Sequence, residues 1–498
     1  MSLTALKEKS VWFVVGSQHL YGKETLDAVD RQSRKVAATL ADSDAMPVTL
    51  DFKGVVTTPS EILAVCKKAN DAEDCVGLVF WMHTFSPAKM WIAGLQALQK
   101  PFLQLNTQYG EEIPWSSIDM NYMNLNQSAH GDREFGYICS RLRIDRKIVC
   151  GHWKDVSTQQ AIGEWTRAAV GHDTMRNTRI ARFGDNMRQV AVTEGDKVDA
   201  QIRLGATVDG YGLGDVAAFV DAVEMGRIKD DVGAVMDSYD VPTELAPGGD
   251  RHSSLIDALQ IELGIRDFLA ENNYHGFTTT FEILHGLKQL PGISAQRMMA
   301  DGFGFGAEGD WKTAILVRTM KTMAQGLPGG SSFMEDYTYD FRAEGGIVLG
   351  SHMLEICPTI ASGKPRVAVH PLAIGGKEDP VRLIFTTPAG PAINVAMVDL
   401  GDRFRWICGE LDVVDAPNEM PKLPVASAFW KTRPSFNTGT ACWMHGGGAH
   451  HSGFSMALNT EHMRDLAEMV GIEMLVIGAD TTVEDFKRDI RLGDVSYR

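Results

Sequence analysis

Continuous apolar runs, each closed by glycine or by a polar turn, alternate with segments of helical periodicity over the first third of the chain. Residues 11–16 (VWFVVG) form the first run, and their β-branched and aromatic side chains are typical of a strand buried on both faces. The segments 75–83 (CVGLVFWMH) and 102–108 (FLQLNTQ) repeat this pattern, with helical spacing at 88–99 between them. Strands alternating with helices predict a doubly wound parallel sheet over roughly the first 170 residues.

A second α/β unit follows. The segment 179–187 (RIARFGDNM) predicts a strand that ends at a polar loop containing Met187. The segment 275–282 (HGFTTTFE) predicts another strand, with Phe281 near its end. The glycine-rich segment 302–309 then predicts a turn between two helices, so the α/β alternation continues beyond it.

Short apolar runs divided by glycine and proline dominate the last third of the chain. Such runs favour antiparallel strands, and they occupy residues 347–356, 366–372, 382–388, 393–401 and 404–414. Because 498 residues exceed what one hydrophobic core usually serves, we expect three domains. They are an N-terminal α/β domain (1–175), a central α/β domain (176–330) and a C-terminal β-rich domain (331–498).

Net charge and cysteine usage limit the expected partners and the cellular compartment. The formal net charge is -16, and nucleic-acid binders usually carry a basic patch, so nucleic acid is not an expected partner. The seven cysteines are scattered without a CxxC pair, which is typical of reduced thiols in a cytosol. The first apolar run is too short for a signal-peptide core or a membrane span. We therefore expect a cytoplasmic protein without a membrane partner.

The glycines of 302–309 (GFGFGAEG) resemble a dinucleotide-binding turn. That fingerprint requires a preceding strand, whereas the preceding ISAQRMMADG has helical character, so we reject a nucleotide site here. Glu308 would instead lie at the start of the next helix, where the helix dipole favours a carboxylate. Two explanations fit this position of Glu308: close approach of a ligand to the glycine backbone, or simple capping of the helix by the carboxylate. The chain also lacks a G-x-S-x-G elbow, a P-loop and an HExxH motif.

Three later segments supply further candidate ligands. Glu335 lies among acids and aromatics in SSFMEDYTYDF, either in a partly desolvated pocket that suits a general base or in a surface turn. His352 follows an apolar run, where a single histidine is more often structural. His450 and His451 are the sharper signal, because adjacent histidines are costly to place without hydrogen-bond or metal partners. Two carboxylates and two imidazoles suit a hard cation, but spacing alone does not separate such a site from scattered polar residues.

Polar residues also follow the first predicted strand. Gln18 and Tyr21 lie in the loop SQHLYG, and ligands of open α/β sheets gather at the carboxyl ends of strands. A polar turn explains this loop equally well. His130 lies in the polar segment AHGD before a helix, where a role beside the helix cap and a role as substrate contact are both open.

Across nearly its full length the chain resembles bacterial L-arabinose isomerases. The shared segments are GSQHLYG, HTFSPAKMW, NLNQSAHGDREFG, RFGDNM, TTTFE, LHGLKQLPG, AEGDWKTA with an altered first residue, GSSFMEDYTY, LGSHMLEICP, LPVA and GGAHH. The resemblance implies a fucose-isomerase-like fold, with two Rossmann-like α/β domains and a C-terminal domain rich in antiparallel β-strands. It also implies a homo-oligomer, often a hexamer, in which the first domain of one subunit completes a neighbour's site.

The resemblance further assigns roles to individual residues. A divalent cation, usually Mn²⁺, would be held by Glu308, Glu335, His352 and His451, with His450 as a neighbour. Co²⁺ and Mg²⁺ are also compatible with these ligands. The residues that would contact the sugar are Gln18, Tyr21, His130, Met187 and Phe281.

The implied reaction is the isomerisation of the aldose L-arabinose to the ketose L-ribulose. The cation would polarise O1 and O2 of the sugar, while Glu308 and Glu335 would move a proton between C2 and C1 through an enediol. A metal-assisted hydride shift is the rival route. The alternative functions are a metal-dependent epimerase or aldolase, another isomerase on a related sugar such as D-galactose to D-tagatose, and a non-catalytic sugar-binding protein.

Overall fold

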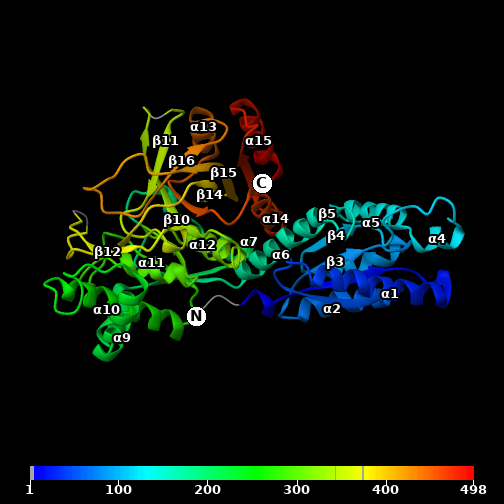
Figure 1. Cartoon of the computed structure of the whole chain (residues 1–498), viewed down its shortest axis with the longest axis horizontal. Coiled ribbons are helices and arrows are strands. Elements are labelled where there is room, and N and C mark those ends of the chain that lie inside the picture. The colour runs from blue at the N-terminus through cyan, green and yellow to red at the C-terminus, as the bar shows by residue number, and fades with distance from the viewer. Residues whose placement is uncertain (1–4, 343, 373–374, 498) are drawn as a thin grey trace. The chain divides into compact units, whose positions relative to one another are not determined.

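The computed structural model describes residues 5–342, 344–372 and 375–497. The chain divides into two compact units, the first being Thr4–Asp173 with Arg464–Met469 and the second Thr174–Met463 with Val470–Arg498. Each unit contains a parallel sheet, and the second also contains a largely antiparallel sheet (Figure 1). The predicted α/β fold with an antiparallel C-terminal region is therefore confirmed.

A five-stranded parallel sheet forms the centre of the first unit, in the order β2-β1-β3-β4-β5. Its strands are β1 (Ser10–Gly16), β2 (Thr49–Val56), β3 (Cys75–Trp81), β4 (Phe102–Asn106) and β5 (Lys147–Cys150). Buried side chains of α1 (Gly22–Ala41) and α6 (Val156–Arg176) pack on one face, and those of α2 (Pro59–Asp71) and α5 (Ser128–Leu142) pack on the other. Burial on both faces explains why β1 has an unbroken apolar run.

The strands predicted at 11–16, 75–83 and 102–108 are confirmed in this unit. The helix predicted over 88–99 is instead a 3-10 turn, η3 (Ala88–Trp91), followed by a short helix, α3 (Ile92–Ala97). The remaining short elements of the unit are η1 (Leu6–Glu8), η2 (His19–Tyr21) and α4 (Met120–Leu125).

The parallel sheet of the second unit has four strands in the order β7-β6-β8-β9. They are β6 (Arg179–Phe183), β7 (Thr207–Tyr211), β8 (Gly276–Thr278) and β9 (Gly304–Gly306). The helical elements of this part are η4 (Ala191–Thr193), α7 (Lys197–Leu204), α8 (Leu213–Asp221), α9 (Met225–Ser238), α10 (His252–Glu271), α11 (Gly292–Ala300) and α12 (Trp311–Met323).

Two sequence predictions for this sheet are wrong. The strand predicted over 275–282 ends at Thr278, so Phe281 lies in the loop beyond it. The glycine-rich segment 302–309 is not simply a turn, because it contains strand β9. A side chain at Gly304 would meet the backbone oxygen of Ala314, so glycine in the strand lets the buried helix α12 pack directly against it.

A seven-stranded sheet follows in the second unit, with the order β14-β17-β10-β11-β16-β15-β18. Because β14 also pairs with β15, the strands from β14 to β15 close on themselves, and only β18 is parallel to its neighbour. These strands are β10 (Ser331–Asp340), β11 (Ile347–Ser351), β14 (Gly390–Asp399), β15 (Phe404–Val414), β16 (Ser427–Thr432), β17 (His451–Ser455) and β18 (Glu473–Ile477). The other elements are η5 (Pro358–Ile360), β12 (Arg366–Val369), β13 (Val381–Ile384), α13 (Phe436–Gly446), α14 (Thr460–Val470) and α15 (Val483–Ser496).

The register of β10 with its two neighbours positions three candidate ligands. Glu335 lies opposite His451 of β17 on one side and opposite Ser351 of β11 on the other. Residues directly opposite one another in an antiparallel pair have Cβ atoms about 5 Å apart. His352 follows Ser351 directly, so the pairing brings Glu335, His352 and His451 to one region of the sheet.

Membrane helices and disulfides are both absent from the described residues. None of the helices there combines the length and the apolar character needed to cross a bilayer. None of the seven cysteines forms a disulfide, and only Cys150 among them is exposed.

We predict that Gly306→Ala destabilises the protein, because the new methyl group would meet the backbone oxygen of Asp310 and the amide nitrogen of Ala314. Overpacking of this kind costs about 1–3 kcal/mol. The measurement is the thermal unfolding midpoint. Gly233→Ala in α9 is the matched control, because open space surrounds Gly233 and alanine in a helix interior stabilises by about 0.5–1 kcal/mol. An unchanged midpoint in Gly306→Ala would contradict the proposed packing.

Candidate metal centre

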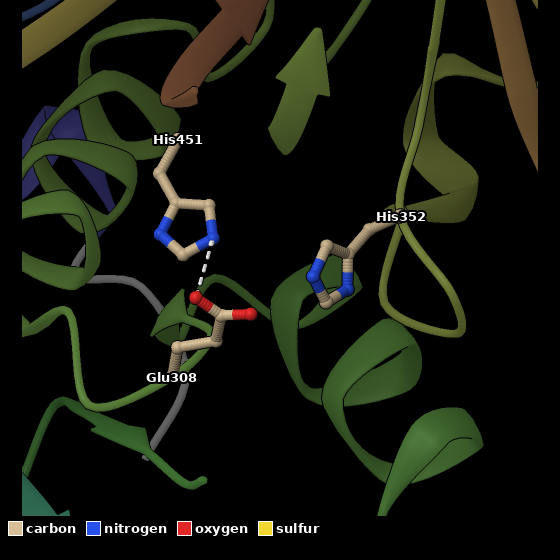
Figure 2. A group of neighbouring side chains, drawn as sticks. All are labelled: Glu308, His352 and His451. Atoms are coloured by element: carbon tan, nitrogen blue, oxygen red, sulfur yellow. Dashed lines mark ion pairs between the residues drawn. The ribbon is translucent and has the colours of Figure 1, made fainter. Parts of the chain in front are cut away.

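Glu308, His352 and His451 converge in the second unit. Each offers one ligand atom, and these atoms all lie within 4.8 Å of one another. Figure 2 shows the three side chains pointing toward a common point, with the ion pair between His451 and Glu308 dashed. Glu308 comes from the segment between β9 and α12, His352 follows β11, and His451 begins β17. Three segments far apart in sequence therefore build one site.

The backbone holds Glu308 in a strained conformation. Its φ of 59° lies in the left-handed region, which non-glycine residues seldom adopt. The carbonyl of Glu308 accepts a hydrogen bond from the Met187 amide at 2.9 Å, and the next amide, of Gly309, donates to Thr279 at 3.0 Å. Strain of this kind clusters at functional sites, where the surrounding structure maintains it.

The capping explanation for Glu308 is wrong. Helix α12 begins at Trp311, and its N-cap is Asp310, whose side chain accepts a hydrogen bond from the amide of Thr313. Glu308 lies two residues before this cap, and its carboxylate faces the histidines instead. It is therefore available as a ligand.

His352 is oriented by a neighbouring carboxylate that the sequence interpretation overlooked. Its Nδ1 lies 2.5 Å from Oε2 of Glu355, which also accepts a hydrogen bond from the amide of Leu354. Burial disfavours the charged imidazole, but the charge and hydrogen bond of Glu355 together with the charges of Glu335 and Glu308 outweigh it and raise the pKa of His352. With Nδ1 engaged, Nε2 faces Oε2 of Glu335 at 3.8 Å.

His451 has a similar arrangement around a different acid. Its Nδ1 lies 3.3 Å from Oδ2 of Asp310, so the proton belongs on Nδ1 and the lone pair on Nε2. Burial lowers the pKa of His451 despite the neighbouring Asp310, which favours the neutral ring that binds metals. Its Nε2 is fully buried, has no hydrogen-bond partner among the described residues and lies 3.9 Å from Oε2 of Glu308.

The two glutamates are the most accessible members of the site. The side chain of Glu335 is 19% exposed and that of Glu308 is 15% exposed, whereas both histidines are buried. Glu335 lies within strand β10, so the surface-turn interpretation of its segment is wrong. It lies beside the three converging residues but outside their group.

His450 is a neighbour of the group. Its Nε2 lies 3.7 Å from Oε2 of Glu308, and its interaction with this carboxylate raises the pKa of His450. Burial acts to raise the pKa of Glu308, but His450, His451 and His352 together hold that pKa below its usual value. Glu308 is therefore ionised near neutral pH.

Aromatic rings enclose the histidines. Phe333 packs edge-on against His352 and His451, with ring centroids 5.1 and 5.0 Å away. Phe281 stacks on His352 at 6.0 Å, and Met187 is tied to Glu308 through its amide. Both predicted sugar contacts of the second unit thus adjoin the candidate ligands. No sequence signal except the aromatic character of SSFMEDYTYDF indicated Phe333.

The other three predicted sugar contacts belong to the first unit. Gln18 follows β1 and is half-buried, and Tyr21 donates a hydrogen bond to Oε1 of Gln127 at 2.8 Å. His130 lies in the first turn of α5, not before it, and its exposed ring stacks on Phe85 at 4.3 Å. Their role toward a sugar stays a prediction.

The donor set of the group fits a divalent cation. One carboxylate oxygen and two imidazole nitrogens lie within reach of one ion, and the unpartnered Nε2 of His451 would gain a partner. Imidazole and carboxylate together suit several first-row divalent ions. Carboxylates on the opposite nitrogen of each ring are a common support for metal-binding histidines. The side chains therefore support a site for a divalent cation.

Family models of L-arabinose isomerase match the chain in three successive parts. The N-terminal domain matches residues 5–177, the central domain residues 179–326 and the C-terminal domain residues 330–473. The chain belongs to the L-arabinose isomerase family. The resemblance recognised from the sequence is confirmed.

Curated members of the L-arabinose isomerase family match nearly the whole chain. The L-arabinose isomerase of Herpetosiphon aurantiacus is 55% identical over 492 residues, which cover 99% of this chain and 98% of the relative. That of Koribacter versatilis is 56% identical over 493 residues, with the same coverage. That of Geobacillus stearothermophilus is 51% identical over 500 residues and covers both chains completely.

We predict that Glu355→Gln weakens metal binding by about 10–100-fold, because the amide cannot hold His352 with the charge of a carboxylate. The measurement is the dissociation constant for Mn²⁺ by equilibrium titration. Glu484→Gln on the exposed face of α15 is the control, with unchanged affinity expected. Wild-type affinity in Glu355→Gln would contradict the role given to Glu355.

Proposed function

We propose that this enzyme converts L-arabinose to L-ribulose at a centre formed by Glu308, Glu335, His352 and His451, with Mn²⁺ as the bound ion. Supporting this, a metal-compatible cluster with an unpartnered buried nitrogen occurs in a chain that matches L-arabinose isomerases over its full length. The same match favours an aldose–ketose isomerase over an epimerase, an aldolase or a binding module. Co²⁺ and Mg²⁺ are alternative ions with compatible ligands.

Glu308 and Glu335 are the proposed acid–base pair. A divalent cation held by these residues would supply positive charge that makes the C2 proton of the open-chain sugar more acidic. Both carboxylates are partly exposed while the histidines are buried, so the glutamates are the groups of this set that a sugar can reach. One removes the proton from C2 and the other returns a proton at C1, through an enediol, while the proton of the O2 hydroxyl passes to O1.

Five residues are proposed to contact the sugar. Phe281 and Met187 adjoin the metal cluster and would bound the sugar on its apolar side. Gln18, Tyr21 and His130 would supply polar contacts from the first unit, because Gln18 lies at the carboxyl end of a parallel strand where such sheets bind ligands.

Quaternary structure, location and domain division are also proposed. We propose a homo-oligomer, with a hexamer as the specific form. Its support is a group of exposed apolar side chains in one segment of the first unit, comprising Ile113, Trp115, Ile118, Met120 and Met123. A cytoplasmic location is supported by the lack of disulfides among the seven cysteines. Division at residues 175 and 330 is supported by the limits of the three family matches.

We predict that metal-stripped protein forms no ketose from L-arabinose and that Mn²⁺, supplied alone, restores activity. The measurement is ketose production after removal of metal by a chelator and addition of one cation at a time. His451→Ala is the control, because without this ring the centre should bind no Mn²⁺ and stay inactive. Full turnover by the stripped protein would refute the metal requirement.

We predict that Glu335→Gln lowers kcat by about 10²–10⁴-fold, the usual contribution of a general acid or base. The assay is run at saturating Mn²⁺, since Glu335 is also a proposed ligand, and circular dichroism checks the fold. Glu410→Gln in β15 is the control, because Glu410 contacts Arg433 and Thr460 and not the cluster. Near-normal isomerisation by Glu335→Gln would rule out its role.

A further inference from the structure

Helix α12 carries a fully buried lysine next to the metal cluster. Lys312 is 0% exposed, and its Nζ donates to the carbonyl oxygens of Thr193 at 2.9 Å and Glu194 at 2.7 Å. The third neighbour of Nζ is Oδ1 of Asp310 at 3.1 Å. A buried ammonium is costly unless its donors and its charge are matched. Here two carbonyls and one carboxylate match them.

The same carboxylate connects this lysine to His451. Asp310 uses Oδ1 for Lys312 and Oδ2 for Nδ1 of His451, and Oδ2 also accepts from the hydroxyl of Thr313 at 2.7 Å. Asp310 is itself 1% exposed, so it has no solvent to replace these partners. Lys312, Asp310 and His451 therefore form a continuous buried chain that ends at the unpartnered Nε2.

The ammonium of Lys312 constrains the carboxylate in two ways. It attracts one oxygen at salt-bridge distance, which fixes the rotation of the carboxyl group and turns the other oxygen toward His451. It also balances a negative charge that would otherwise stand alone in a buried site. Either effect would be felt by the ring that Asp310 orients.

We propose that Lys312 is a positioning residue that acts through Asp310 on His451 and thereby sets the metal affinity of the centre. The proposal rests on the proposed function, since it takes His451 as a metal ligand. Lys312 itself touches neither His451 nor Glu308 by any hydrogen bond or ion pair among the described residues.

The same helix provides a matched comparison. Lys321 is also buried, at 6% exposure, and donates to the carbonyl oxygen of Ser331 at 2.9 Å. Its other neighbours are the sulfur of Cys357 at 3.2 Å and the hydroxyl of Thr359 at 3.5 Å. It has no carboxylate partner among the described residues, so its loss perturbs the same helix without touching the chain to His451.

The test is a double-mutant cycle on Mn²⁺ affinity, measured by the loss of the spectroscopic signal of free Mn²⁺. Lys312→Met and Asp310→Asn should each weaken binding by about tenfold, within the range for groups that support ligands. In the Asp310→Asn background, Lys312→Met should add less than about twofold, because its route to His451 is already cut. Lys321→Met should bind Mn²⁺ like the wild type.

A second variant tests the same inference in case Lys312→Met fails to fold. Lys312→Gln keeps a donor for the carbonyls of Thr193 and Glu194 but removes the charge, and it should show the same loss of affinity. The visible absorption of Co²⁺-loaded Lys312→Gln and Asp310→Asn should change in the same way, whereas that of Lys321→Met should match the wild type.

Three outcomes would overturn the inference. Equal losses from Lys312→Met with and without Asp310→Asn would show that Lys312 acts through the Thr193–Glu194 loop. An equal loss in Lys321→Met would trace the effect to the helix as a whole, and wild-type binding by Lys312→Gln would leave the charge without a role. Failure of the proposed function is distinguishable, because the wild-type protein would then bind no Mn²⁺ at a site that depends on His451.

Discussion

The antiparallel pairing of β10 with β17 and β11 is the constraint on which the metal cluster depends. It places Glu335 opposite His451 and next to the strand that delivers His352. A shift of the register by one residue would turn every side chain of β10 to the other face and separate these groups. Strand β10 lies between β17 and β11 in the sheet, so its register is fixed from both sides. Glu308 then needs only one strained segment at the end of β9 to complete the group.

Charge balance around the two histidines differs, and the difference follows from their supporting acids. Glu355 lies 2.5 Å from His352 and has no lysine or arginine at ion-pair distance among the described residues, and its charge raises the pKa of that ring. Asp310 lies 3.3 Å from His451 and also neighbours Lys312, so its charge acts on two partners, and burial lowers the pKa of His451. The protonated ring is thus favoured at His352 and the neutral ring at His451.

The sequence predicted correctly those strands whose own residues are apolar enough to identify them. The apolar runs of β1, β3 and β4 are buried on both faces, and their composition alone predicts them. Strand β9 was not predicted because its glycines carry no apolar side chains. These glycines are what allow α12 to pack closely against the strand. The strand over 275–282 was predicted too long because Thr279 and Thr280 have high β propensity, but the Thr279 carbonyl accepts from Gly309 and the chain turns into the site.

Partners of the candidate ligands lie beyond what a pattern in sequence reveals. Glu355 follows His352 by three residues, yet only the loop conformation brings its carboxylate to Nδ1. Asp310 has the position of an ordinary N-cap and does cap α12, so its second contact, with His451, is visible only after β17 is placed. The family resemblance named four candidate ligands because it carries information about tertiary structure that spacing lacks.

The surroundings of the two histidines also determine whether a metal ion must displace a proton from each ring. A ligand histidine binds through a neutral nitrogen, so metal binding competes with any proton on Nε2. His451 is already biased to the neutral ring by burial, and its Nε2 has no hydrogen-bond partner among the described residues to give up. His352, with its raised pKa, holds a proton to higher pH, so the competition between metal and proton falls mainly on that ring. Metal affinity in this centre should therefore weaken on acidification through His352 first, because burial keeps the ring of His451 neutral.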